Sequence, residues 1–298
     1  MNLPTNRWSL YRTAHEAALS QQVWRGFTEA AQVSERPAAA RSAERRILAT
    51  ESRAAPLDEM VIGIKFRPLK LLTLAHVGVF WSSISRRYPR AEHAPPIFDA
   101  PDDPHVGLPP PRLWFLDASG AKLLQFQTDR FVLNWRRRPD GPEYPSFSSM
   151  QHEFLELWEA YLTYLERAEL GIIEDPACEL SYINVIDDRT GWSGSPDATD
   201  LTQCVRWNLP SGQNPLGRLR SVGWHIAYEI EENGGSFSAS LRHGTRKVDQ
   251  HPVLRLDLTA SGPVSSASRA DLERWLAPAH AASSFAFDLI WRSGASAS

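Results

Sequence analysis

Residues 124–136 read LQFQTDRFVLNWR. Apolar and polar residues alternate along this stretch, as in a strand with one buried face. The apolar positions change from even to odd numbers midway, and that one-residue shift requires a bulge or a turn near Asp129 and Arg130. The stretch therefore predicts two adjacent strands, over 122–128 and 130–137.

The chain around these two strands predicts a first α+β unit over 56–175. A helix over 148–170 carries one apolar stripe at helical spacing, and Gly171 ends it. The remaining elements of this unit are a strand over 60–66, a helix over 71–88, a long exposed loop over 90–111 and a strand over 112–117.

The following residues, 176–298, predict a second unit with the same order of elements. A hairpin turn at Asn233-Gly234-Gly235 joins two of its strands. The predicted elements are strands over 177–187, 219–231, 236–246 and 253–260, a short helix over 198–205, and a final helix over 268–290 that Pro278 is expected to kink.

The two units predict an α+β fold made of tandem β-α-β-β-β-α pseudo-repeats. Their strands are expected to form curved antiparallel sheet, with the helices on one face and the other face open. Residues 1–55 predict an N-terminal extension, a helix over 8–31 followed by a linker rich in Ala, Arg, Ser and Glu. We expect residues 1–50 to be dispensable for folding.

Composition excludes several classes of protein. The 298 residues carry 32 basic and 35 acidic side chains, and 42% of them are hydrophobic, which excludes a disordered chain and a strongly basic nucleic-acid-binding protein. Two cysteines, Cys178 and Cys204, exclude a disulfide scaffold. The sequence shows neither a long apolar run nor a secretory signal, so we expect a cytoplasmic protein with no membrane association. We expect no cofactor and no metal site.

Polar side chains on the predicted sheet supply the candidate site. Amide and guanidinium groups on one face suit hydrogen-bonded recognition of a peptide, a nucleotide or a carboxylate. The alternative is an internal hydrogen-bond network that joins the sheet to a loop. The candidate binding residues are Gln125, Gln127, Asp129, Arg130, Asn134 and Arg136, with Tyr182 and Asn184 extending the same face and His76 facing a cleft.

Two other functions stay open. One is an enzyme whose non-standard site would be built around His76, Asp129, Arg130 and Asn134; we assign no catalytic residue. Nucleotide-loop, zinc-protease and common hydrolase motifs do not occur in the sequence. The other is nucleic-acid binding through the arginines at 136–138 beside Trp135, which the net charge of −3 does not favour.

Several of these motifs together resemble an uncharacterised, sporadically distributed bacterial protein family. The resemblance covers 56–187, continues more weakly to about residue 290, and excludes 1–55. It implies no established activity or catalytic residue. It is carried by PLDEMV (56–61), FRP (66–68), HVGVFW (76–81), YP (88–89), RLWF (112–115), QFQTDRFVLNWR (125–136), YPSF (144–147) and ELSYIN (179–184).

A sporadic distribution is typical of accessory genes, such as anti-phage defence and toxin–antitoxin modules. The sequence therefore favours a non-enzymatic binding or regulatory protein of such a module. Its open sheet face would hold a ligand or a partner protein encoded nearby.

Overall fold

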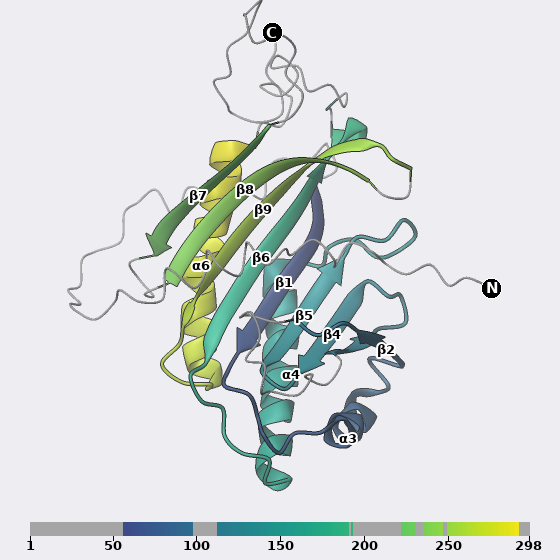
Figure 1. The fold of residues 1–298 in the computed structure, drawn as a ribbon, viewed down its shortest axis with the longest axis vertical. Helices are drawn as coiled ribbons and strands as arrows, with labels where there is room; N and C mark the ends of the chain where they lie inside the picture. Colours follow the sequence, from purple (N-terminus) through teal and green to yellow (C-terminus); the bar gives the residue numbers. More distant parts are fainter. Residues whose placement is uncertain are drawn as a thin grey trace, which may run out of the picture.

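Nine strands pair into one antiparallel sheet, in the spatial order β2-β3-β4-β5-β1-β6-β9-β8-β7 (Figure 1). The arrangement comes from a computed structural model, which describes residues 56–97, 112–190, 192, 222–230, 235–246 and 249–291. Several predictions lie outside these residues: the extension over 1–55, the short helix over 198–205, and the hairpin residues 233 and 234.

The first half of the described chain begins with β1 and ends with α4. Its elements are β1 (Leu57–Lys65), α3 (Leu74–Ile84), β2 (Arg90–Ala94), β3 (Arg112–Leu116), β4 (Lys122–Gln127), β5 (Arg130–Arg136) and α4 (Phe147–Arg167). A two-residue turn, Thr128-Asp129, connects β4 to β5 and leaves Gln127 opposite Arg130. This turn accounts for the shift of the apolar residues from even-numbered positions in β4 to odd-numbered positions in β5.

The second half has a similar order, with one strand fewer and with only a 3-10 turn described between its first two strands. Its elements are β6 (Ala177–Ile186), a 3-10 turn η2 (Asp188–Thr190), β7 (Gly223–Ile230), β8 (Gly235–Thr245), β9 (Pro252–Pro263) and α6 (Arg269–Ile290). Pro278 lies inside α6, so the proline does not end the helix. The side chain of Ser268 caps the start of this helix by accepting a hydrogen bond from the Asp271 amide.

One predicted loop contains a strand. Residues 90–94 were expected to be part of an exposed loop, but they form β2, which pairs with β3 at one edge of the sheet. Four of these five residues are exposed. An edge strand is held by backbone hydrogen bonds to a single neighbour and needs no apolar face, so it leaves no pattern in the sequence.

The two halves are arranged about the centre of the sheet. The first strand of each half, β1 or β6, is central, and the last strand of that half lies beside it. Reading outward, β1-β5-β4-β3 corresponds to β6-β9-β8-β7, and a helix follows β5 and β9 alike. The predicted tandem repeat of an α+β unit is confirmed, with β2 added at the edge of the first half.

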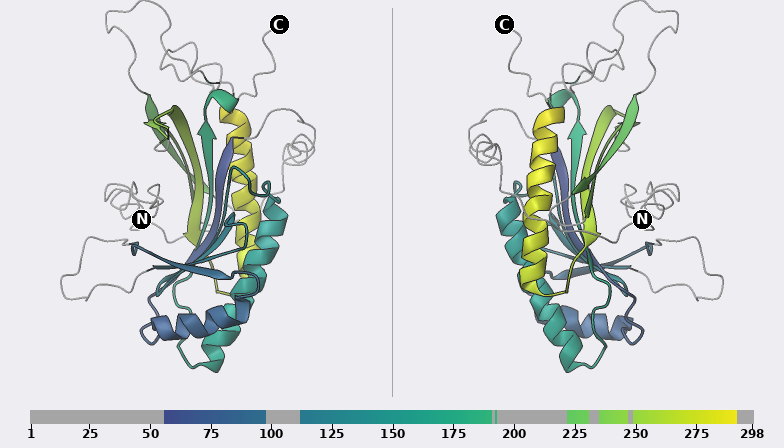
Figure 2. Two further views of the ribbon diagram at one scale, coloured as in Figure 1. Left: turned by 90° about the vertical axis from the view of Figure 1, so that its right-hand side faces the viewer. Right: turned by 90° about the vertical axis from the view of Figure 1, so that its left-hand side faces the viewer.

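The helices cover one face of this sheet. Figure 2 shows α4 and α6 side by side on that face, and both ends of the sheet bend away from them. α3 packs against the same face, where Phe80 contacts Phe126 and Tyr161 with ring centroids 5.3 Å apart. We call the opposite face, which none of the described helices covers, the concave face.

The main core lies between the sheet and α4. Phe131 of β5 stands edge-on to Trp158 of α4, with ring centroids 5.2 Å apart, and stacks on Tyr161 at the same distance. All three side chains are buried. Aromatic pairs in such geometries contribute stability beyond their buried area. The apolar stripe predicted for this helix therefore faces the core, as expected.

A buried carboxylate fixes α4 to the rest of the first half. Glu153 accepts hydrogen bonds from the Tyr88 hydroxyl at 2.7 Å and from the Lys122 ammonium, and Arg87 pairs with it at 3.0 Å. Burial alone would raise the pKa of Glu153, but these donors outweigh that effect and lower it. The carboxylate thus stays ionised among its partners.

Trp158→Ala should destabilise the protein by about 3–5 kcal/mol, because the change leaves a large cavity in the core. It also removes a hydrogen bond of 2.8 Å from the indole N–H to the Ala267 carbonyl. Chemical denaturation measures the loss. Trp158→Phe, which keeps much of the apolar volume, should lose less. A cost below about 1 kcal/mol for Trp158→Ala would contradict the burial of this side chain.

Candidate functional site

Polar side chains of four neighbouring strands form one hydrogen-bonded chain on the concave face. The Trp114 indole N–H of β3 donates to the Gln125 carbonyl oxygen at 3.0 Å, and the Gln125 amide donates to Asn134. Asn134 in turn donates to the Glu59 carboxylate of β1, which also accepts from Arg136 at 3.2 Å. The guanidinium of Arg136 lies 4.8 Å from the centre of the Trp114 ring. We call this set the amide network.

A second polar group lies at the β4–β5 turn. Arg130 donates twice to the Asp129 carboxylate, at 3.0 and 2.8 Å. Gln127 donates to the same carboxylate at 3.0 Å and exchanges two hydrogen bonds of 2.9 Å with the backbone of Ile97. This group therefore fastens the segment after β2 to the sheet.

Both groups are largely internal. Gln125, Gln127, Arg130 and Asn134 are each less than a tenth exposed, and every one of them has a partner within the chain. The structure thus brings together six of the predicted site residues, Gln125, Gln127, Asp129, Arg130, Asn134 and Arg136. It favours the internal network over an exposed recognition surface for the buried amides, because their donors and acceptors are already used.

Tyr182 and Asn184 do not extend this face, which corrects the prediction. They lie at alternate positions of β6 opposite Leu258 and Leu256 of β9, which are buried in the core. The Tyr182 hydroxyl shares a hydrogen bond of 2.8 Å with His280 of α6. Both side chains therefore belong to the helix-covered side of the sheet.

His76 lies apart from these polar groups. Its Nδ1 accepts a hydrogen bond of 3.2 Å from the Thr73 amide and lies 3.0 Å from the Thr73 hydroxyl, at the start of α3. The His76 carbonyl accepts from the Tyr164 hydroxyl at 2.8 Å. His76 therefore caps the start of α3 through Thr73. No hydrogen bond among the described residues joins it to the amide network.

The three arginines at 136–138 are each held by acceptors of the protein. Arg136 pairs with Glu59 at 3.2 Å, Arg137 donates to the Leu57 carbonyl at 2.9 Å, and Arg138 donates to the Gly120 carbonyl at 3.0 Å. Side chains held in this way secure the end of β5. Their arrangement gives no particular support to phosphate binding.

The second half presents hydroxyl groups on the concave face that the sequence analysis did not single out. Ser181 of β6 lies opposite Thr259 of β9, and Thr259 lies opposite Ser238 of β8. The Ser181 and Thr259 hydroxyls are 3.0 Å apart. The full set, which we call the hydroxyl patch, is Ser181, Ser236, Ser238, Ser240, Thr259 and Ser261. Alternating serines at 236, 238 and 240 were visible in the sequence.

Charged side chains border the hydroxyl patch. Asp257 of β9 accepts from Arg242 at 2.7 Å and from Arg255 at 2.7 Å. These side chains are partly exposed, as are Ser238 and Ser240. Among the described residues, no hydrogen-bond partner occurs for the Ser238 and Ser240 hydroxyls. This part of the concave face therefore offers two hydroxyl groups that the described residues leave without a partner.

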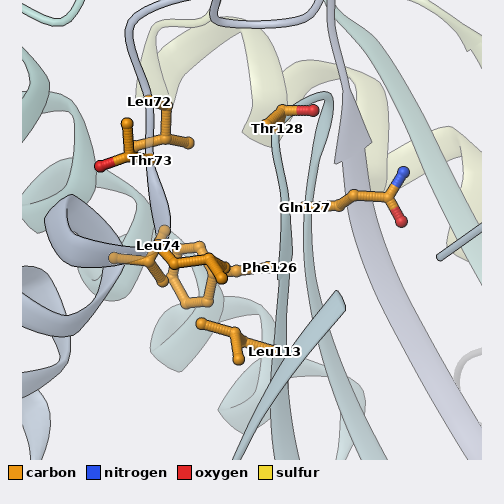
Figure 3. A pocket seen from close by; sticks show the side chains of 8 residues that line it. Leu72, Thr73, Leu74, Leu113, Phe126, Gln127 and Thr128 are labelled. Atoms are coloured by element: carbon orange, nitrogen blue, oxygen red, sulfur yellow. The ribbon is translucent and has the colours of Figure 1, made fainter. Parts of the chain in front are cut away.

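Two hollows of the described surface lie away from the hydroxyl patch. Figure 3 shows a small pocket at the start of α3, where Leu74 faces Phe126, while Gln127 points to the other side of β4. Its volume is about 10 Å³, which is room for about one water molecule. A wider hollow of about 260 Å³ lies beside Arg86 and Glu156, and no predicted site residue lines it.

Metal and thiol chemistry receive no structural support within the described ranges. No cluster of three or more His, Cys, Asp or Glu side chains is placed there to hold a metal ion. Burial raises the pKa of the Cys178 thiol, and Cys204 lies outside the described residues. No α-helix among the described residues is long and apolar enough to cross a membrane.

Comparison with known proteins adds no relative: no protein-family model matches the chain, and no curated protein matches it. The candidate site is therefore described by the positions and hydrogen bonds of its residues on the concave face.

Asn134→Ala should destabilise the protein by about 1–3 kcal/mol, because the buried side-chain N–H of Gln125 loses its acceptor and the Glu59 carboxylate loses one of its donors. Chemical denaturation of Gln125→Ala, Asn134→Ala and the double variant measures how far the two residues depend on each other. The double variant should lose less stability than the two single losses together. Additive losses, each below about 0.5 kcal/mol, would contradict an internal network.

Stability should fall between pH 7 and about pH 5 because of His280. Burial lowers the pKa of His280 from 6.5 to about 4. The unfolded chain therefore takes up a proton near pH 6.5, whereas the folded protein does so only near pH 4. The loss should be about 1–2 kcal/mol. Denaturant titrations at both pH values measure it, and His280→Gln should show a smaller loss. Equal pH dependence in the two proteins would exclude His280 as the cause.

Proposed function

We propose that this chain is a non-enzymatic binding or regulatory protein, and that the concave face of its sheet holds a partner protein or a ligand. The observation that carries the proposal is the hydroxyl patch on a curved sheet. Within this patch, Ser238 and Ser240 are partly exposed, and their hydroxyls have no hydrogen-bond partner among the described residues. Small hydroxyl side chains both donate and accept, so they suit close contact with polar groups of another molecule.

The two parts of the concave face would have different tasks in this proposal. The amide network is satisfied internally and fixes the positions of β3, β4, β5 and β1 relative to one another. The hydroxyl patch on β6, β9 and β8 would then make the contacts. A rigid surface loses little conformational freedom when it binds, which favours affinity.

The setting of this activity comes from the resemblance to a sporadically distributed bacterial family. Such a distribution supports a role in an accessory module of the anti-phage defence or toxin–antitoxin type, in the cytoplasm, with a partner encoded by a neighbouring gene. The first partner to test is therefore the product of the gene next to this one.

Ser238→Arg should abolish binding and leave the fold intact. Ser238 lies in the middle of the hydroxyl patch between Thr259 and Ala227, and a long charged side chain there would stand between the sheet and its partner. The variant and the native chain are each co-expressed with the neighbouring gene product, and the amount captured is compared. The native chain should capture the product in stoichiometric amount, and Ser238→Arg should not.

The matched control is Ser82→Arg. Ser82 is an exposed serine of α3, on the helix-bearing side of the sheet, so the same change there should leave binding unaltered. Thermal denaturation confirms that both variants are folded. Full capture by a folded Ser238→Arg protein would overturn the hydroxyl patch as the contact surface.

A further inference from the structure

The two edges of the sheet differ in how they are protected. β2 is five residues long and carries Arg90, Glu92 and His93, all exposed. Charged side chains on a short strand discourage pairing with another chain. β7 is eight residues long, reads GWHIAYEI, and contains no Lys, Arg or Pro. The β7 edge is longer than the β2 edge and has no Lys, Arg or Pro, so it has fewer of the features that keep an edge strand from pairing.

The backbone of β7 presents hydrogen-bonding groups outward. The His243 amide donates to the Val222 carbonyl at 3.2 Å, which marks these two residues as a hydrogen-bonded position of the β7–β8 ladder. Hydrogen-bonded pairs alternate along an antiparallel ladder, and the even-numbered residues of β7 therefore bond to β8. His225, Ala227 and Glu229 direct their N–H and C=O groups to the outer edge. No described residue pairs with that edge.

We propose that β7 pairs with β7 of a second copy of this chain, antiparallel, about a two-fold axis at Ala227. In this register Ala227 lies opposite the partner's Ala227, and the two residues exchange backbone hydrogen bonds. His225 lies opposite the partner's Glu229, and the same pair occurs a second time across the axis. The proposal is independent of the binding function assigned to the concave face.

The pairing of a histidine with a carboxylate selects this register. A shift by two residues would place His225 opposite the partner's Ala227 and lose both His–Glu pairs, whereas a shift by one would place polar residues opposite apolar ones. An imidazole N–H directly across an antiparallel pair from a carboxylate can donate a hydrogen bond to it. The strand is thus complementary to itself about Ala227.

The same register covers apolar surface. Ile226 and Tyr228 are 39% and 60% exposed, although they lie on the helix-bearing side of the sheet. Pairing about Ala227 places Ile226 opposite the partner's Tyr228, twice. In a monomer these two apolar side chains remain in contact with water. In the proposed dimer, each packs against a side chain of the second copy and its exposed apolar area is reduced.

Light scattering coupled to size-exclusion chromatography of the full chain tests the association. The native protein should show twice the chain mass of 33.5 kDa. Ala227→Pro removes an outward N–H but none of the bonds to β8, so this variant should be a monomer with unchanged far-ultraviolet circular dichroism. Ala227→Val, which keeps the N–H, should remain a dimer. A native monomer at micromolar concentration would overturn the proposal, and so would a dimeric Ala227→Pro protein.

Cysteine cross-linking tests the register. Ala227→Cys should form a disulfide-linked dimer under mild oxidation, because directly opposite residues are within disulfide reach. Glu229→Cys should not cross-link to itself but should cross-link to His225→Cys when the two variants are mixed. The native protein reports any linkage through its own cysteines. A dimer in which Ala227→Cys does not cross-link would overturn pairing through β7.

Charge reversal provides a third readout. His225→Glu places two carboxylates opposite each other and should weaken the dimer at least about tenfold in Kd. Glu229→Lys should weaken it as well. A mixture of the two variants places Glu opposite Lys and should restore association. Failure of the mixture to associate more tightly than either variant alone would contradict the His225–Glu229 pairing.

Discussion

The antiparallel pairing of β1 with β6 is the contact on which the rest of the structure depends. Met60 lies opposite Tyr182, Ile62 opposite Leu180, and Ile64 opposite Cys178, so the apolar faces of both strands are aligned on the helix-bearing side. The other strands are added outward from this centre. A one-residue slip between β1 and β6 would turn half of the core toward solvent, and for this reason the apolar faces fix the register.

The concave face shows two ways of using polar groups. Gln125 and Asn134 are buried and bonded to each other, so their amides stabilise the sheet and are expensive to disturb. Ser238 and Ser240 are partly exposed, and their hydroxyls have no partner among the described residues. A polar residue type alone does not separate these cases. The two cases differ in whether the fold places a hydrogen-bond partner next to the polar group.

Periodicity predicted the elements that bury an apolar stripe or face. α4, β4 and β5 were found close to their predicted bounds because one side of each packs against the core. The sequence did not predict β2, because an edge strand of exposed residues carries no such pattern. Tyr182 and Asn184 were assigned to the wrong face because apolar and polar residues do not alternate regularly along β6, and only its pairing with β9 defines which side is buried.

The internal nature of the amide network could not be predicted from local sequence. Asn134 donates to Glu59 of β1, which lies 75 residues earlier in the chain. In the separate polar group at the β4–β5 turn, Gln127 bonds to the backbone of Ile97. These partners meet only after the sheet has formed. The hydroxyl patch combines residues of three strands in the same way, although the alternation of serines along β8 was visible.

The seam between β1 and β6 has the geometry of a subunit interface enclosed within one polypeptide. The two strands occupy equivalent positions in their halves and run antiparallel, so a local two-fold axis passes between them. In two separate chains, the same strand pairing would join the subunits of a symmetric dimer, and its occupancy would depend on concentration. The connection from α4 to β6 makes that association intramolecular. The pairing of the two halves then depends on the effective concentration set by the connecting segment and not on the concentration of the protein. Because the halves are no longer identical chains, each can carry its own sequence.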